Sequence, residues 1–479
     1  MTFYAHRPFA PDKINHQKRQ KAMKKALLAF MLAAPTLFTY ADVFQTSGEG
    51  KLYLLETLAR TEGSGVTKSQ ENNVTYTIHS VITIAKGDSL SLNCGEAINV
   101  LFAHGAGIIV EGAYTTASQN KVRCEKTDAE ASPMGIIIEE QEGQPTIDML
   151  ELTGVRITNH SSKGLLFNQV HFEGFGEDAS GAFVLQPSGA CFQFQNCSFK
   201  DNQRAAIGGA ANYYCPVELK ECLFTNNSLA NNNIPQLNLT VANSIVIDNC
   251  RILGNPELNM VGGIGISNFM SFEPAKVIIR NSSITDNRYG IGTVGPMDIV
   301  IEGNELKDNC HELNPMNGGS GISLYDPYYR TSAYIQGNRI EGSLWGITII
   351  GCKDVNIGRI DVAADDTNYN PGQNIFKDNG NNGVRYDLYN NSANTVYAQG
   401  NTWNVSEQTE ELIEEVIFHQ KDDASLGEVI FMPAGSSIQS IATSSILPPA
   451  TIYNLHGQRL NSVPRHGMYI EGGKKRHLR

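Results

Sequence analysis

The feature that most constrains the fold is a recurring pattern of alternating apolar residues. Each copy holds an apolar-x-apolar pair, and three residues after it a second alternating pair follows. Alternation with a period of two is typical of a strand that buries one face, and the step of three predicts a sharp bend between two strands. Copies begin at Phe192, Val217, Ile245, Val277, Ile299, Ala333, Val355 and Val396, with earlier copies at Leu150 and Leu165.

Two further features complete each repeat. An Asn often follows the second pair, where it is suited to a left-handed bend, and a Gly-apolar pair then predicts a third short strand. Three strands and three bends per repeat predict an all-β fold, a right-handed parallel β-helix whose coils bury a core only when they stack. The Asn residues are Asn202, Asn227, Asn255, Asn287 and Asn309. The Gly-apolar pairs are Gly290-Ile291, Gly321-Ile322, Gly346-Ile347 and Gly383-Val384.

The spacing of the copies indicates where loops are inserted. The separations run from 22 to 41 residues, so the longer repeats are expected to carry insertions. The earliest copies conflict, because the 15 residues from Val155 to Val170 are too few for a coil. One of these two residues is therefore misassigned as the start of a second apolar pair.

Residues 1–41 have the pattern of a leader and signal peptide. A basic segment begins at Met23, an apolar run covers 26–38, and small residues precede a cleavage site after Ala41. The run is too short to span a bilayer, so we expect an exported chain without a transmembrane span after cleavage. Cleavage leaves 30 basic and 48 acidic residues. This acidic surface excludes nucleic acid as a partner, and it repels polyanionic sugars unless a cation or a local basic patch intervenes.

The nine cysteines form no CxxC pair, which argues against a zinc site. Cys197, Cys222 and Cys250 share one repeat position and are predicted to stack in the core, with disulfide pairing of neighbours as the alternative.

Both ends of a stacked sheet need caps, and short amphipathic helices are predicted at 53–60 and 409–418. A Ser/Pro-rich linker precedes a basic tail in which alternating apolar residues predict a β-hairpin. The expected organisation is a leader at 1–41, an N-terminal cap at 42–75, the β-helix at 76–404, a C-terminal cap at 405–435, a linker at 436–449 and a tail at 450–479.

Three stretches give the chain a resemblance to the pectin-lyase-like right-handed β-helix proteins exported by Bacteroidetes. Residues 80–92 with 107–112 resemble the N-terminal strand ladder of the family. Asn401-x-Trp403, Ile417 and 427–433 resemble its closing segment, although Asn404 replaces the usual Gly. Residues 452–459 with 467–470 resemble a C-terminal sorting signal of type IX secretion. The resemblance implies a secreted or surface-attached protein whose tail is recognised by the secretion machinery.

Aromatic and charged residues near the Gly-apolar strands suggest a binding groove on one side of the coil stack. Tyrosine rings can stack on sugars, while Arg and Asp can hydrogen-bond hydroxyls or a carboxylate. The alternative is that these residues cap turns and pair on the surface. The candidates are Tyr213, Tyr214, Tyr325, Asp326, Tyr328, Arg330, Arg385, Tyr386 and Asp387.

An acidic insertion in the longest repeat offers a possible calcium site. Asp361, Asp365 and Asp366 could supply the oxygen ligands that Ca²⁺ prefers, or they could simply be solvated.

Two classes of function fit these features. The first is a non-catalytic protein that recognises an extracellular polysaccharide or matrix polymer along its flank. The second is a polysaccharide lyase or glycosidase, with Arg330 and Arg385 as uronate contacts and Tyr386 as the base.

Overall fold

The computed structural model describes residues 42–433, apart from 71–72, 94, 117–118, 210–213, 241–242 and 270–272, and the strands at 452–453, 459–460, 467–471 and 474–478. The chain divides into two units, residues 1–432 and 433–479. The predicted leader and linker lie outside the described residues, as do Cys94 and Tyr213.

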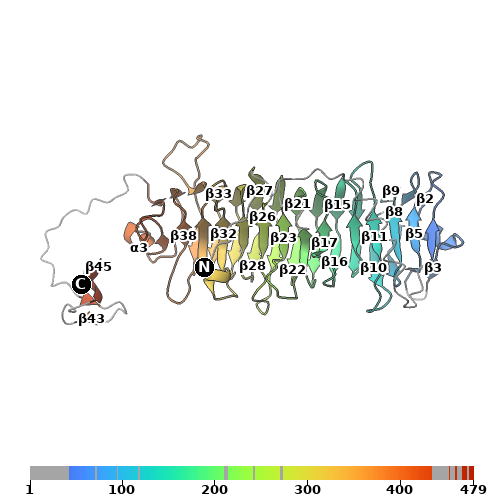
Figure 1. Ribbon diagram of the computed structural model, residues 1–479, viewed down its shortest axis with the longest axis horizontal. Coiled ribbons are helices and arrows are strands. Elements are labelled where there is room, and N and C mark those ends of the chain that lie inside the picture. Colours follow the sequence, from blue (N-terminus) through green and yellow to red (C-terminus); the bar gives the residue numbers. More distant parts are fainter. Residues whose placement is uncertain are drawn as a thin grey trace, which may run out of the picture. The chain divides into compact units, whose positions relative to one another are not determined.

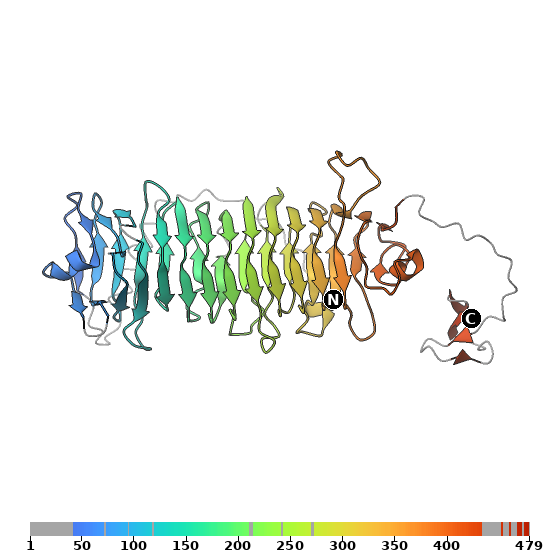
Figure 2. The ribbon, with the colours of Figure 1, turned by 180° about the vertical axis from the view of Figure 1, so that it is seen from behind.

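The first unit is a right-handed parallel β-helix, which confirms the predicted fold class. Successive coils stack side by side along the long axis of the unit (Figure 1), and the same stack is seen from behind in Figure 2. Phe192, Val217 and Ile245 open three successive copies of the repeat, and they are register partners in adjacent strands. The sequence period is therefore the period of the coil.

Three long sheets form the sides of the described coils. The eleven-stranded sheet consists of β12 (Thr146–Asp148), β15 (Gly164–Asn168), β18 (Cys191–Gln195), β21 (Val217–Lys220), β24 (Ser244–Asp248), β27 (Ala275–Arg280), β30 (Met297–Glu302), β33 (Ser332–Gln336), β36 (Asp354–Gly358), β39 (Val396–Ala398) and β41 (Val429–Ile430). The nine-stranded sheet consists of β17 (Gly181–Leu185), β20 (Ala205–Gly209), β23 (Leu237–Thr240), β26 (Ile264–Ser267), β29 (Ile291–Val294), β32 (Ser320–Tyr325), β35 (Trp345–Ile350), β38 (Leu388–Asn391) and β40 (Ile417–Phe418).

The thirteen-stranded sheet connects these two in each coil. It consists of β3 (Val66–Ser69), β4 (Thr75–Ile78), β7 (Ile98–Phe102), β10 (Val122–Lys126), β13 (Leu150–Thr153), β16 (His171–Glu173), β19 (Ser198–Lys200), β22 (Leu223–Thr225), β25 (Arg251–Leu253), β28 (Ser283–Thr285), β31 (Glu305–Lys307), β34 (Arg339–Glu341) and β37 (Ile375–Lys377).

Two smaller sheets complete the N-terminal coils. They consist of β1 (Val43–Gln45), β5 (Val81–Ile84), β8 (Gly107–Val110), β11 (Gly135–Ile138) and β14 (Ile157–Asn159), and of β2 (Leu52–Tyr53), β6 (Ser89–Leu90) and β9 (Ala113–Tyr114).

The inward residues of the repeat form one continuous core. Phenylalanine rings of adjacent coils stack inside it, with ring centroids of Phe172 and Phe199 4.5 Å apart and those of Phe199 and Phe224 5.2 Å apart. Cys197, Cys222 and Cys250 are buried at one position, as predicted, and their thiols are free. A hydrogen bond with Cys197, together with burial, raises the pKa of the Cys222 thiol.

The bends differ from the prediction in one respect. The left-handed residue is the one before Asn202, Asn227, Asn287 and Asn309, with φ of 53° at Asp201 and 57° at Asp286. Asn202 and Asn287 are instead buried at the corner. The amide of Asn287 donates to Asn309 Oδ1 of the next coil at 3.1 Å. The Asn side chain lies inside the corner because the backbone groups there have no partner in a strand and need a hydrogen bond.

Two expectations about the repeats need correction. Gly383-Val384 does not open a strand: β38 begins at Leu388, which is the register partner of Ile347. Val155 is the residue that was misassigned as the start of a second apolar pair. Leu152 pairs with Phe172, so Leu150 is the residue of its coil that is equivalent to Val170.

The cap helices are shorter than expected. They are α2 (Leu55–Arg60) and α3 (Glu410–Glu414), since Tyr53 and Phe418 instead join the sheets as strand residues.

The second unit contains a small antiparallel sheet, which confirms the predicted hairpin character of the tail. Its described strands are β42 (Ile452–Tyr453), β43 (Arg459–Leu460), β44 (Gly467–Glu471) and β45 (Lys474–Leu478). Among the residues that the structure describes, no helix is long and apolar enough to cross a membrane.

Candidate functional site

The predicted site residues fall at two opposite edges of the nine-stranded sheet. Tyr325 ends β32 and the stretch to Arg330 follows it, while Tyr214 follows β20 several coils away. Arg385, Tyr386 and Asp387 precede β38, so they lie at the edge where strands of this sheet begin. The described candidates therefore lie at both ends of the strands of one sheet and do not form one cluster.

Two of the candidate carboxylates hold loops together. Asp326 is fully buried and accepts hydrogen bonds from the backbone N–H groups of Tyr328, Arg330 and Thr331, at 3.1, 2.8 and 2.7 Å. Asp387 is also fully buried and accepts from the Asn404 N–H at 2.7 Å. Neither carboxylate is positioned to contact a ligand in the solvent.

The candidate lyase residues are dispersed. The guanidinium of Arg330 lies 5.2 Å from the ring centre of Tyr328, and Arg385 lies 4.0 Å from Glu415. Burial raises the pKa of Tyr386, which disfavours the phenolate that a base would need. The geometry therefore gives no support to Tyr386 as a catalytic base.

The acidic insertion does not form a calcium cage. Asp361 is 3.4 Å from Arg359, and Asp366 accepts hydrogen bonds from the backbone and side chain of Asn368. Across the described part of the chain, no group of three or more His, Cys, Asp or Glu side chains is suited to hold a metal ion.

A depression lies on the outer face of the nine-stranded sheet. We call it the aromatic groove; its volume is about 800 Å³. Its floor is a row of small outward residues that are register partners in adjacent strands: Asn238, Gly265, Gly292, Ser323 and Thr348. The rings of Pro235 and Tyr289 lie over the two glycines of this row, so a ligand that follows the helix axis would contact these rings.

Aromatic side chains form the walls of the groove. Trp345 and Tyr389 are stacked with ring centroids 4.7 Å apart, and Phe418 continues the stack at 4.6 Å from Tyr389. Tyr386 packs against the same stack, 5.9 Å from Trp345. Tyr325 stands on the opposite rim with 40% of its surface exposed.

Arg288 places a positive charge in this groove. It lines the groove, is 6% exposed, and its Nε is buried without a hydrogen-bond partner. Its guanidinium lies 5.0 Å from the ring centre of Tyr289, and no described carboxylate pairs with it. The Tyr289 side chain lies over Gly265 and Gly292 of the floor, since a Cβ at Gly292 would be 3.0 Å from its ring and a Cβ at Gly265 would be 3.4 Å from its hydroxyl oxygen. A buried cation without a carboxylate partner favours an anionic group in the ligand.

Tyr325 and Tyr386 were predicted from the sequence, whereas Arg288, Tyr289, Trp345 and Tyr389 were not. A usable signal exists, because an aromatic residue directly precedes Gly-Ile in two repeats, at Tyr289-Gly290-Ile291 and Trp345-Gly346-Ile347. Its position marks the edge of the nine-stranded sheet where the groove wall begins.

Comparisons with known proteins match a family model to part of the chain and find similar solved structures. No curated protein sequence matches the chain significantly. Among solved structures, it is similar to a mutant of the periplasmic alginate epimerase AlgG, at 13% identity over 80% of this chain and 77% of that chain, with a TM-score of 0.34. It is also similar to the A-module of the Azotobacter vinelandii mannuronan C-5 epimerase AlgE6, at 12% identity over 86% of this chain and 93% of that chain, with a TM-score of 0.30. A family model described as a right handed beta helix region matches residues 153–325, in agreement with the coils described above.

Proposed function

We propose that this protein binds an acidic polysaccharide along the aromatic groove and does not transform it. The observation that carries the proposal is Arg288, a buried guanidinium in a groove walled by aromatic rings. Aromatic faces pack against the C–H faces of sugar rings, and the buried cation would pair with a carboxylate or sulfate substituent. It supplies the local positive charge that an otherwise acidic protein needs to hold a polyanion.

The shape of the site supports a polymer as ligand. The floor residues belong to five adjacent strands, from β23 to β35. Neighbouring strands lie about 4.8 Å apart, so the floor extends roughly 19 Å along the axis. This length accommodates several consecutive sugar units.

The proposed setting is outside the cell. Support comes from the leader pattern in residues 1–41 and from the basic tail, whose resemblance to a sorting signal makes the secretion machinery its proposed partner. Secretion or attachment to the outer cell surface would bring the groove into contact with extracellular polymers. Expression of the full chain in a bacterium with type IX secretion, with and without residues 450–479, tests this part: loss of the tail should retain the protein inside the cell.

The binding proposal is tested by titration calorimetry with oligomers of alginate, polygalacturonate, sulfated dextran and neutral dextran. We expect binding of at least one acidic oligomer and about a tenfold loss of affinity in Arg288→Met, because a charge-assisted hydrogen bond contributes about 1.5–3 kcal/mol. Tyr325→Leu should weaken binding by a similar factor, because Tyr325 lines the groove and 40% of its surface is exposed.

Tyr328→Leu is the matched control, since Tyr328 is 72% exposed and is not among the groove residues. Its affinity should equal that of the wild type. Absence of binding to every oligomer would refute the proposal. Ultraviolet absorbance from unsaturated sugar ends during incubation would instead establish a lyase.

A further inference from the structure

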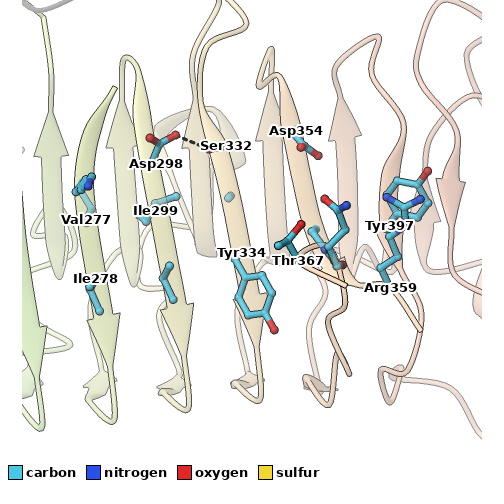
Figure 3. Close-up of a pocket in the computed structure, with 15 residues that line it drawn as sticks. Val277, Ile278, Asp298, Ile299, Ser332, Tyr334, Asp354, Arg359, Thr367 and Tyr397 are labelled. Carbon is cyan, nitrogen blue, oxygen red and sulfur yellow. Dashed lines mark hydrogen bonds between the residues drawn. The ribbon is translucent and has the colours of Figure 1, made fainter. Parts of the chain in front are cut away.

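A second pocket lies on a different side of the coil, on the outer face of the eleven-stranded sheet. It has a volume of about 340 Å³ and is built on strands β27, β30, β33, β36 and β39. Thr367 and Asn368, in the insertion that follows β36, form its wall. Figure 3 shows the side chains of Asp298, Asp354, Tyr334 and Thr367 around it.

Two parallel rows of side chains form the floor of this pocket. One row is polar and consists of the register partners Lys276, Asp298, Ser332 and Asp354. The other row is largely apolar and aromatic and consists of the register partners Ile278, Val300, Tyr334, Asn356 and Tyr397. A ligand lying on this floor therefore meets an apolar surface along one side and hydrogen-bonding groups along the other.

Several polar groups at this floor have unused acceptor capacity. Asn356 donates to the Asn368 carbonyl at 2.7 Å, but its own Oδ1 is buried without a hydrogen-bond partner. Asp354 is exposed and forms no ion pair with any described residue. Asp298 accepts a hydrogen bond from the Ser332 hydroxyl, which leaves its other oxygen available. A buried acceptor without a partner is costly, so a ligand that donates to it is favoured.

Two basic side chains line this pocket together with the two aspartates. Lys276 is the register partner of Asp298, and Arg359 lies near the other end. The Arg359 guanidinium lies 4.0 Å from the ring centre of Tyr397, and its Nε is 3.4 Å from Asp361. The two aspartates and the two basic side chains of the lining balance in formal charge, so the pocket suits a ligand without net charge, in contrast to the aromatic groove with Arg288.

We propose that this pocket binds one uncharged pyranose residue of a glycan. A pyranose has an apolar C–H face that can lie against Tyr334 and Val300, and hydroxyl groups that can donate to Asp354 and Asn356 Oδ1. Near Tyr334 and Asn356, the exposed carboxylate of Asp354 disfavours a uronate or sulfated sugar by repulsion between like charges. This inference is independent of the proposed groove function, because the two sites lie on different sheets and select ligands of different charge.

The test is ligand-observed saturation-transfer NMR on the full chain. The ligands are the methyl glycosides of glucose, galactose and mannose, with methyl glucuronide as the acidic counterpart. We expect saturation transfer to at least one neutral glycoside, and a Kd at least tenfold higher in Tyr334→Val and in Asp354→Ala. Because Asp354 is exposed, its truncation should leave the fold intact, which a thermal melt verifies.

Arg288→Met is the control variant, since it alters the aromatic groove and leaves this pocket unchanged. It should bind the neutral glycoside with wild-type affinity. The inference is overturned if no neutral glycoside binds, if both pocket variants bind as the wild type does, or if methyl glucuronide binds equally well. Loss of acidic-oligomer binding in Arg288→Met with no effect here would keep the two proposals distinct.

Discussion

At the scale of single residues, burial sets the chemistry of Asp387 at the last turns of the coil. Its carboxylate accepts hydrogen bonds from the Asn404 N–H at 2.7 Å and from Asn379 Nδ2 at 3.1 Å. Burial nevertheless dominates and raises the pKa of Asp387 to about 6. The charged form is therefore less favourable in the folded protein than in the unfolded chain.

This shift predicts a pH-dependent free energy of unfolding. Because the folded-state pKa is raised, the contribution of Asp387 is fully present below the pKa of the unfolded chain and is lost as the pH rises through about 6. The loss amounts to about 3 kcal/mol, from 1.36 kcal/mol per pKa unit. Denaturant unfolding of the wild type and Asp387→Asn, compared between pH 4 and pH 7.5, should show a difference that changes over this window. A difference that stays constant with pH would contradict the prediction.

At the scale of elements, one row of corner side chains changes its chemistry along the coil. The position occupied by Cys197, Cys222 and Cys250 continues as Ser282 and then as Asn304, Asn338, Asn374 and Asn401. Asn338 Oδ1 accepts from the backbone N–H and the side chain of Asn304, at 2.9 and 3.0 Å. The row therefore supplies hydrogen bonds at the first bend, where strand pairing stops.

Removal of one amide from this row should destabilise the coil. Asn338→Ala leaves the Asn304 N–H and amide without their acceptor, and each buried unsatisfied group costs about 1–3 kcal/mol. Asn338→Ser should cost less, because Ser282 at the equivalent position accepts from the Cys250 N–H at 3.0 Å. Denaturant unfolding measures both. Equal losses for Ala and Ser would show that side-chain volume, and not hydrogen bonding, decides the stability.

At the scale of the whole molecule, the coil unit and the tail unit have separate sheets. The strands of residues 452–478 pair with one another, while β41 and β40 end two sheets of the coil unit. A chain of residues 42–432 should therefore unfold at the same temperature as one of residues 42–479, because no strand of the coil unit loses a partner. Circular dichroism melts compare the two chains. A clearly lower midpoint for the shorter chain would show that the tail stabilises the coil.

The extent of successful prediction follows from the range of the interactions involved. The period-two alternation and the step of three are local, so the coil, its core and the cysteine stack were predictable from the residues alone. The pairing of β35 with β38 was not predictable from the residues alone. Gly383-Val384 has the local Gly-apolar pattern, but Leu388 is the residue that pairs with Ile347. Ile347 and Leu388 are 41 residues apart, so their pairing depends on how the chain stacks on the preceding coil and not on the local sequence.

The binding surfaces depend even more on the tertiary structure. The sequence by itself determined that the chain winds into stacked coils, because the apolar alternation in each repeat decides which side chains face inward. Only the tertiary structure decided which outward residues become neighbours, since three different coils supply the groove residues Arg288 and Tyr289, Trp345, and Tyr389. The insertions change the number of residues between coils, so register and not sequence spacing places these side chains in one groove.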